Sequence, residues 1–397
     1  MKTNVRASLF WFIGFLLFNA SVSAQKLSSK KPYIVEKSYY QEIPFEYVRG
    51  KIIIPVTLQG EVYRFILDTG APNIISDRLM EKMGIIPFDS VNVSDANETK
   101  QKMGLVQVPE LSLADLHFFN TTALVHIVAN DDIFNCFQID GFIGSNILHY
   151  SVLQINHKER KLVVTDAIDQ VKVDEKIKTK LHLFGSQNSP YAWITIEGKG
   201  KNQVLLDTGM EGSYDISFKA HNTFSKKDFY KPMAKGDGAA GMGLFGTGES
   251  NTHYRTVIKE IGLGGTVFKN TLAETTTDNN SRIGASFFEQ GTATFDFKKK
   301  KFYFESYVNT PDISEKLLGF SPTLKNKKVV VGIVWNDTLR NQMNPGDEII
   351  SINGQLLSTI TACSLLTETS IFKSSDTLIL EIKNSKGEIT EVISERE

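Results

Sequence analysis

Short apolar segments separated by turn residues run along most of the chain. Residues 52–58 and 62–67 are apolar or alternate between apolar and polar positions, and a Gln-Gly-Glu turn separates them. Segments 193–196 and 204–206 repeat this arrangement around a Gly-Lys-Gly turn. Such spacing is typical of β-hairpins. The pattern predicts a mostly β protein.

The chain also contains an internal repeat. An apolar run leads into Asp-Thr-Gly at 68–70 and again at 207–209, and an Ile-Gly pair follows at 143–144 and at 283–284. Between these landmarks, Glu-Leu-Ser-Leu near the middle of the first copy parallels Glu-Ile-Gly-Leu in the second. Three landmarks in one order at nearly equal spacing indicate a duplicated unit. Each copy is predicted to form one mostly β lobe of roughly 120 residues.

Two acidic residues, Asp68 and Asp207, occupy matching positions in the repeat. A carboxylate directly after a buried strand is costly unless it is hydrogen-bonded or has a function, and a nearby glycine lets backbone amides approach it. A single Asp-Thr-Gly is often only a turn or a helix cap. Because the whole context is repeated, we expect the two loops to face each other. Adjacent carboxylates then share one proton and form an acid–base pair.

With these motifs, residues 45–306 resemble the retropepsin-like and pepsin-like aspartic peptidases. The resemblance rests on both Asp-Thr-Gly triplets and on Phe-Ile-Gly at 142–144 and Arg-Ile-Gly at 282–284. It implies two retropepsin-like β-barrel lobes in one chain, at 45–167 and 185–306. It also implies an aspartic-type endopeptidase that hydrolyses peptide or unfolded-protein substrates with a water held between two carboxylates.

The resemblance carries over to individual residues. It implies that Asp68 and Asp207 are catalytic. It implies that the residues supporting the two active-site loops are Thr69, Gly70, Thr208 and Gly209, with the threonines gripping each other between the lobes.

Two residues depart from the pepsin-like pattern, because Ala71 and Met210 stand where those enzymes usually have Ser or Thr. Without these hydroxyl donors the pair should be less acidic, which predicts activity at weakly acidic pH. The unusual Met-Glu-Gly at 210–212 leaves open an altered second loop. The alternative function is therefore a non-catalytic exported peptide-binding or adaptor protein that keeps the fold. Segments near 97–100 and at 236–248 are expected to cover the cleft.

The C-terminal residues 310–395 resemble a PDZ domain of α+β type. Leu318, Gly319 and Phe320 resemble the carboxylate-binding loop of PDZ domains, and Asn-Pro-Gly-Asp to Asn-Gly at 344–354 resembles their turn–strand–turn. The resemblance implies binding of a C-terminal peptide by addition of a strand to a sheet edge. The alternative is a module that only packs on the peptidase, or a structural protein of the cell envelope.

The N-terminus has the pattern of an export signal. Lys2 and Arg6 precede an apolar run, and Val-Ser-Ala ends at Ala24, which predicts a signal peptide at 1–24. An uncleaved anchor is the alternative. Residues 25–44 are expected to be an N-terminal extension. The protein is predicted to be exported to the periplasm or outside the cell, or associated with the cell envelope, without a stable membrane span after signal removal.

The remaining composition excludes several kinds of partner. The net charge is −1, and without a basic stripe nucleic-acid binding is not expected. The seven histidines form no zinc motif, so no metal and no organic cofactor are expected. The match of 236–241 to a dinucleotide fingerprint lacks the required βαβ context. Cys136 and Cys363 fall in different predicted domains, so we expect two unpaired, buried thiols rather than a disulfide.

Overall fold

The computed structural model describes residues 32–129, 133–239, 241–326, 328–359, 361–368 and 370–397. The predicted signal peptide at 1–24, and the first part of the predicted extension, lie outside these residues. The described chain is mostly β, as predicted. No helix among the described residues is long and apolar enough to cross a membrane. The prediction of an export signal therefore stays a prediction.

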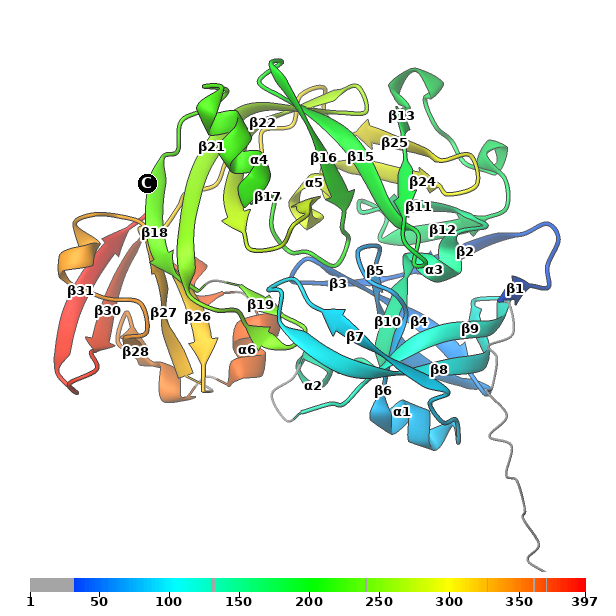
Figure 1. The fold of residues 1–397 in the computed structure, drawn as a ribbon, viewed down its shortest axis with the longest axis horizontal. Helices are drawn as coiled ribbons and strands as arrows, with labels where there is room; N and C mark the ends of the chain where they lie inside the picture. Colours follow the sequence, from blue (N-terminus) through cyan, green and yellow to red (C-terminus); the bar gives the residue numbers. More distant parts are fainter. Residues whose placement is uncertain (1–31, 130–132, 240, 327, 360, 369) are drawn as a thin grey trace, which may run out of the picture.

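The first half of the chain forms a sheet of nine described strands (Figure 1), in the order β1-β9-β6-β10-β5-β4-β8-β7 with β3 beside β4. These strands are β1 (Tyr33–Ile34), β3 (Glu46–Val48), β4 (Lys51–Leu58), β5 (Glu61–Asp68), β6 (Ile74–Ser76), β7 (Asp89–Ser94), β8 (Lys100–Leu113), β9 (Leu116–His126) and β10 (Gly141–Gly144). Three short helices, α1 (Asp77–Lys82), α2 (Ile133–Phe137) and α3 (Ser145–Leu148), follow strands of this sheet. We call this part lobe 1.

The second half, lobe 2, repeats these pairings. In lobe 1, β10 runs parallel to β5 and antiparallel to β6, and β6 runs parallel to β9. In lobe 2, β23 runs parallel to β16 and antiparallel to β17, and β17 runs parallel to β22. The lobe 2 elements are β14 (His182–Phe184), β15 (Ser189–Ile196), β16 (Gly200–Leu206), β17 (Tyr214–Ser217), α4 (Phe218–Lys226), β18 (Ala234–Gly238), β21 (Asn251–Leu263), β22 (Thr266–Thr276), β23 (Ser281–Ile283) and α5 (Ala285–Phe288).

A third sheet joins the lobes. It has the order β13-β25-β24-β11-β12-β2, and its strands are β2 (Tyr40–Pro44), β11 (Val152–Asn156), β12 (Lys161–Thr165), β13 (Thr179–Lys180), β24 (Gly291–Asp296) and β25 (Lys301–Ser306). At its centre β11 pairs with β24, and the Gln154 side chain donates to Thr294 Oγ1 at 2.9 Å. Because β2 is part of this sheet, residues 40–44 of the predicted extension are integrated into the fold.

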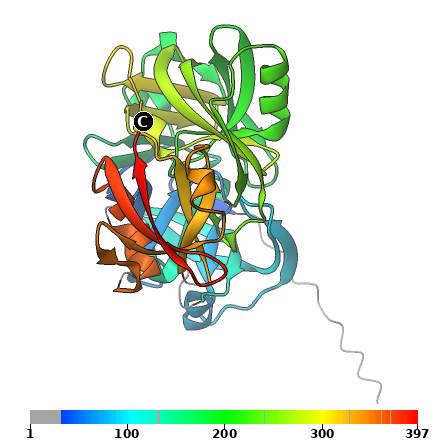
Figure 2. The same cartoon turned by 90° about the vertical axis from the view of Figure 1, so that its left-hand side faces the viewer.

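The C-terminal residues form a unit with its own apolar core, centred on Phe320, Leu378 and Leu380. Its elements are β26 (Phe320–Lys325), β27 (Lys328–Val334), β28 (Glu348–Ile352), β29 (Gln355–Leu356), α6 (Ala362–Thr367), β30 (Thr377–Lys383) and β31 (Ile389–Glu395). The unit lies beside lobe 2 (Figure 2), where Gly238 in β18 pairs with Ile333 in β27. A Cβ on Gly238 would lie 1.9 Å from the Gly332 carbonyl oxygen, so this contact requires glycine. The PDZ resemblance of the unit stays a prediction.

The two cysteines are bonded to each other, so the prediction of unpaired thiols was wrong. Cys136 in α2 and Cys363 in α6 form a disulfide that joins lobe 1 to the C-terminal unit, with a sequence separation of 227. The prediction failed because it took membership of different domains as separation in space. Here the C-terminal unit folds back so that α6 lies beside α2, with the two Cα atoms 4.5 Å apart.

We expect the disulfide to stabilise the arrangement of the lobes and the C-terminal unit, because it closes a very long loop in the unfolded chain. Replacing both cysteines by serine should lower the free energy of unfolding by about 2–4 kcal/mol. Denaturant unfolding of the wild type with and without dithiothreitol provides the comparison, and the reduced wild type should match the double variant. Two free thiols in the unreduced, unfolded wild type would contradict the assignment.

Candidate active site

Each of the two predicted aspartates stands at the end of a buried apolar strand. Asp68 is the last residue of β5 and follows three buried residues, and Asp207 directly follows β16. In each lobe, the parallel strand beside this one ends level with the aspartate. Gly144 is opposite Asp68 in the register, and the Asp207 amide donates to the Ile283 carbonyl at 2.9 Å. The sequence thus places both carboxyl groups at equivalent edges of two sheets.

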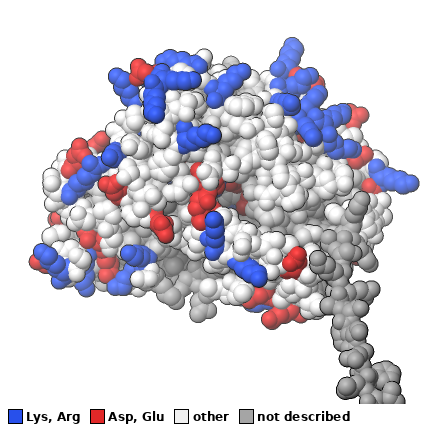
Figure 3. Space-filling model, viewed as in Figure 1, with Lys and Arg blue, Asp and Glu red and all other residues white. Residues whose placement is uncertain are grey.

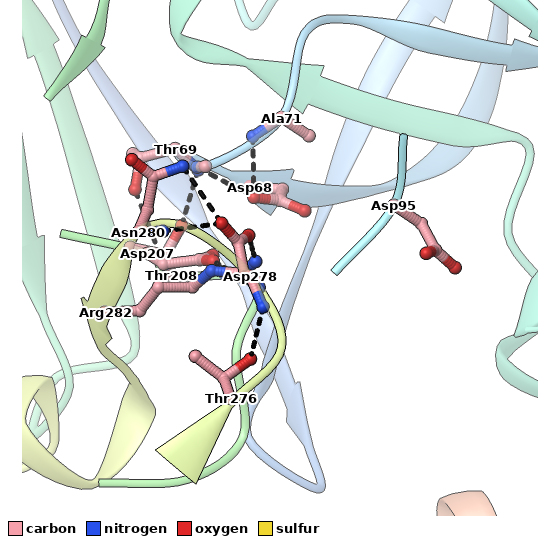
Figure 4. A network of polar contacts seen from close by, with 12 residues as sticks. Asp68, Thr69, Ala71, Asp95, Asp207, Thr208, Thr276, Asp278, Asn280 and Arg282 are labelled. Atoms are coloured by element: carbon pink, nitrogen blue, oxygen red, sulfur yellow. Dashed lines mark hydrogen bonds and ion pairs between the residues drawn. The ribbon is translucent and has the colours of Figure 1, made fainter. Parts of the chain in front are cut away.

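The threonines of the two triplets bond the lobes to each other (Figure 4). The Thr69 amide donates to Thr208 Oγ1 at 3.0 Å, and the Thr208 amide donates to Thr69 Oγ1 at 3.1 Å. Each hydroxyl donates in turn to a carbonyl of the opposite lobe, from Thr69 to Leu206 at 2.6 Å and from Thr208 to Leu67 at 2.9 Å. Both threonines are buried. Four reciprocal hydrogen bonds therefore fix the two loops against each other.

This contact also brings the two carboxyl groups together. Each carboxyl group lies over the glycine of the triplet in the other lobe. A Cβ on Gly70 would lie 2.6 Å from Asp207 Cγ, and a Cβ on Gly209 would lie 2.3 Å from Asp68 Cγ. Any side chain at either glycine would displace the opposite carboxyl group. The two carboxyl groups are close enough to hydrogen-bond to each other. The structure therefore brings all six predicted residues of the two triplets into one site.

Backbone amides hold the two carboxyl groups unequally. Asp68 Oδ1 accepts from the amides of Gly70 at 2.9 Å and Ala71 at 3.0 Å. Asp207 Oδ1 accepts from the Gly209 amide at 2.9 Å, while the Met210 amide donates to the backbone carbonyl of Asp207. Neither Ala71 nor Met210 supplies a hydroxyl donor. Within the described part of the chain, the hydrogen bonds to the two carboxyl groups come from backbone amides.

The surroundings of Asp68 favour its protonated form. Burial and the nearby charge of Asp207 raise the pKa of Asp68 to about 7, against a smaller lowering by the Lys51 ammonium. Because two adjacent carboxyl groups titrate as a unit, this value describes the pair as much as the residue. The pair therefore retains one proton at weakly acidic pH.

Lys51, the first residue of β4, was not predicted from the sequence, and its ammonium donates to the Gly209 carbonyl of the other lobe. On the opposite side of the site, Gln187 donates to the Gly70 carbonyl at 3.5 Å and to Ser189 Oγ at 2.5 Å. Each loop is thus held by one further side chain from across the interface. A charged residue at the start of an otherwise apolar strand was the available signal for Lys51.

The unusual Met-Glu-Gly segment is anchored rather than displaced. Arg49 of lobe 1 pairs with Glu211 at 3.0 Å, and a Cβ on Gly50 would lie 3.1 Å from Glu211 Cγ. The turn at Asp207 keeps its hydrogen bonds to the opposite lobe. An altered second loop, which the sequence left open, therefore does not separate the two carboxyl groups.

Both aspartates line a cavity of about 1790 Å³ between the lobes. The two segments expected to cover it meet above it. The β7–β8 turn contacts the hairpin of β19 (Met242–Gly243) and β20 (Gly246–Thr247). The Phe245 amide donates to Asp95 Oδ2, and Asn97 Nδ2 donates to the Gly246 carbonyl, both at 2.9 Å. The two covering segments are therefore hydrogen-bonded to each other at the cavity.

The three predicted PDZ residues lie at the junction with lobe 2. Leu318 and Phe320 are buried, and the Leu318 carbonyl accepts from Arg255 of β21 at 2.9 Å. The Gly319 carbonyl accepts from the amide of Trp335 at 2.8 Å. The predicted peptide-binding segment is therefore partly occupied by contacts within the chain, and ligand binding there stays a prediction.

No group of three or more His, Cys, Asp or Glu side chains in the described part of the chain is arranged to hold a metal ion. The observed site consists of two carboxyl groups, backbone amides and the surrounding cations. This arrangement can bind and polarise a water molecule or a carbonyl oxygen between the carboxyl groups.

Comparison with known proteins agrees with the chemistry of the site. Residues 54–147, which include Asp68, match the family model described as aspartyl protease. Among solved structures, the aspartic proteinase from Irpex lacteus is similar at 12% identity and a TM-score of 0.42, covering 68% of this chain and 98% of that chain. No curated protein matches the sequence. The family match over lobe 1 supports an aspartic peptidase.

Proposed function

We propose that this protein is an aspartic-type endopeptidase whose catalytic residues are Asp68 and Asp207. The observation that carries the proposal is the reciprocal bonding of Thr69 and Thr208, which holds two carboxyl groups side by side at a large cavity between the lobes. A binding protein would gain nothing from two adjacent buried carboxylates, because their repulsion is unfavourable unless they share a proton. Proton transfer in a hydrolytic reaction uses that arrangement directly.

In the proposed starting state the pair shares one proton, which we assign to Asp68 because burial and the charge of Asp207 favour its protonated form. In the proposed reaction Asp207 takes a proton from a water held between the carboxyl groups, and the water oxygen bonds to the carbon of the scissile amide. Asp68 gives its proton to the carbonyl oxygen, which forms a neutral tetrahedral intermediate. Asp207 then gives the proton it took to the amide nitrogen, and Asp68 takes back a proton from one hydroxyl of the intermediate. The carbon–nitrogen bond breaks, and the products are a carboxylic acid and an amine.

For the C-terminal unit we propose a PDZ-like module that positions lobe 2 and its covering hairpin. The Arg255 guanidinium of lobe 2 donates to the Leu318 carbonyl and to Ser321 Oγ. Its Cζ atom lies 4.4 Å from the centroid of the Trp335 ring. Thr247 at the end of the hairpin donates to the Leu324 carbonyl of β26 at 2.7 Å. These contacts occupy part of β26, the strand that a peptide ligand would approach. They favour positioning over binding of a C-terminal peptide, which stays the second possibility.

The main alternative is a non-catalytic peptide-binding protein with the same fold. The weaker holding of Asp207, by one backbone amide, is the observation that favours it. Under this alternative, peptides bind in the cavity without being cleaved, and removal of either carboxyl charge leaves binding in place.

Replacement of Asp68 or Asp207 by Asn should lower kcat/KM for peptide cleavage by about 10²–10⁴-fold, because each variant removes one member of the acid–base pair. The neutral amide keeps the size of the side chain, so circular dichroism and the melting temperature should change little. Digestion of a broad peptide library, followed by mass spectrometry, gives the measurement. Asp115→Asn, in an exposed turn of lobe 1, is the matched control and should cleave like the wild type. Undiminished cleavage by both active-site variants would exclude the mechanism.

The pH dependence of cleavage should have a falling limb near neutrality. Since the folded pKa of Asp68 is raised to about 7, the proton needed for catalysis is present below that pH and is lost above it. We therefore expect kcat/KM to decline as the pH rises through about 7, with substantial activity at weakly acidic pH. A profile from pH 3 to 9 with one quenched peptide tests this. Activity confined below about pH 3 would contradict the prediction, because the pair would then be more acidic than free carboxyl groups.

We also propose that the protein is exported. The basic and apolar N-terminal pattern supports this, and so does the Cys136–Cys363 bond, because disulfides persist mainly in oxidising compartments. Intact-mass analysis of the protein from the natural host should give a chain that begins at Gln25 and contains one disulfide. Recovery of an uncleaved, reduced chain from the cytosol would rule out export.

A further inference from the structure

The cavity has two walls of opposite character, and matching positions in the two sheets produce them. In lobe 1, the register places Phe142 beside Ile74, Ile74 beside Leu124, and Leu124 beside Leu105. These four apolar side chains form a row across four strands, which we call the lobe 1 row. All four line the cavity.

The equivalent positions in lobe 2 carry charges. The register places Arg282 beside Asp215, Asp215 beside Glu274, and Glu274 beside Arg255. We call these residues the lobe 2 row. The pairings are the same as in the lobe 1 row, strand for strand. Arg282, Asp215 and Glu274 line the cavity, whereas the Arg255 side chain reaches the C-terminal unit.

The orientation of β17 explains why Asp215 faces the cavity. Its neighbours Tyr214 and Ile216 are 2% and 1% exposed and belong to the apolar core. Successive side chains of a strand point to opposite sides of the sheet, so Asp215 must point away from that core. A carboxylate therefore stands at the position of Ile74 in lobe 1.

Asp215 lacks the ionic partner that its neighbours have. Glu274 accepts from Arg255 Nε at 2.7 Å, and Asp278 pairs with Arg282, as Figure 4 shows. Within the described residues, the Asp215 carboxyl group has no hydrogen bond or ion pair. Burial, against the attraction of Arg282, raises the pKa of Asp215 to about 7. The attraction of Arg282 therefore offsets only part of the cost of burying its charged form.

The lobe 2 wall has an excess of acidic over basic side chains. Asp207, Asp215, Glu274 and Asp278 are four carboxyl groups against the two arginines of the row, and Arg282 also lies 3.9 Å from Asp207. Acidic side chains are visible in the hollow at the middle of the molecule in Figure 3. A cation entering beside Asp215 would reduce this excess and give that carboxylate a charged partner.

The lobe 1 wall already holds an apolar side chain. Phe245, at the tip of the covering hairpin, packs against the cluster that contains Ile74, Leu124 and Phe142. Its ring stacks on His126 with 6.4 Å between the ring centroids. This wall therefore accepts a large apolar group from another segment of chain.

We propose that the cleft selects peptides with a large apolar side chain at the lobe 1 row and a lysine or arginine side chain at Asp215 in the lobe 2 row. The inference rests on the proposed peptidase function and adds the class of substrate to it. Asp215 is a specificity residue in this account, because it contacts a side chain of the substrate and not the reacting atoms. Its carboxylate forms a charge-assisted hydrogen bond with the basic group.

The test compares two sets of peptides that differ at one position. In one set, the scissile bond joins Leu or Phe to Lys or Arg, with either residue first. In the other set, norleucine replaces the basic residue. The wild type should give a higher kcat/KM for the basic set, by roughly tenfold. Asp215→Asn should abolish this ratio. Glu260→Gln, which removes an exposed charge in the same lobe, should keep it.

The outcomes separate this inference from the proposed function. Equal cleavage of both sets by the wild type, or an unchanged ratio in Asp215→Asn, would overturn the substrate class and leave the peptidase assignment intact. If neither set is cleaved, the same peptides with a reduced CH₂–NH bond are measured by calorimetry. Tighter binding of the basic peptide by the wild type, lost in Asp215→Asn, would support the subsite without catalysis. Equal binding would exclude it.

Discussion

The structure depends on the reciprocal hydrogen bonds between Thr69 and Thr208. Two like charges do not approach each other in a protein interior unless other contacts hold them there. In this chain the four hydrogen bonds of the threonines supply that constraint, and Gly70 and Gly209 leave the room that the opposite carboxyl groups occupy. The hydrogen bond from Lys51 to the Gly209 carbonyl and the Arg49–Glu211 ion pair also hold the loop that follows Asp207. The chemistry proposed for the site follows from this forced proximity.

The duplicated architecture makes the two halves of the site alike in their backbone, although their side chains differ. Equal strand pairings in the two lobes place the triplets at equivalent sheet edges. The same pairings place apolar residues at one wall of the cavity and charged residues at the other. Repetition of the backbone is therefore compatible with divergence of side chains that a substrate would contact. The C-terminal unit adds a second asymmetry, since its contacts reach the hairpin of lobe 2 and its disulfide reaches α2 of lobe 1.

Much of this arrangement could be predicted from sequence, because it is encoded by local patterns that occur twice. The apolar runs before Asp68 and Asp207 predict buried strands, and the repeated triplets predict two loops that face each other. The disulfide could not be predicted, because the position of Cys363 depends on how the C-terminal unit folds back onto lobe 1. Lys51 and Asp215 were also missed. Their importance depends on strand register and on contacts between lobes, which no local pattern specifies.

The central claim is that Asp68 and Asp207 form one acid–base pair with a single proton. Neutron diffraction from crystals grown at weakly acidic pH, with a tetrahedral mimic of the statine type in the cavity, tests it most directly. The account predicts carboxyl oxygens within about 3 Å of each other or of the mimic hydroxyl, with one proton shared by the pair. Two unprotonated carboxylates that point away from each other, with the mimic bound elsewhere, would contradict it.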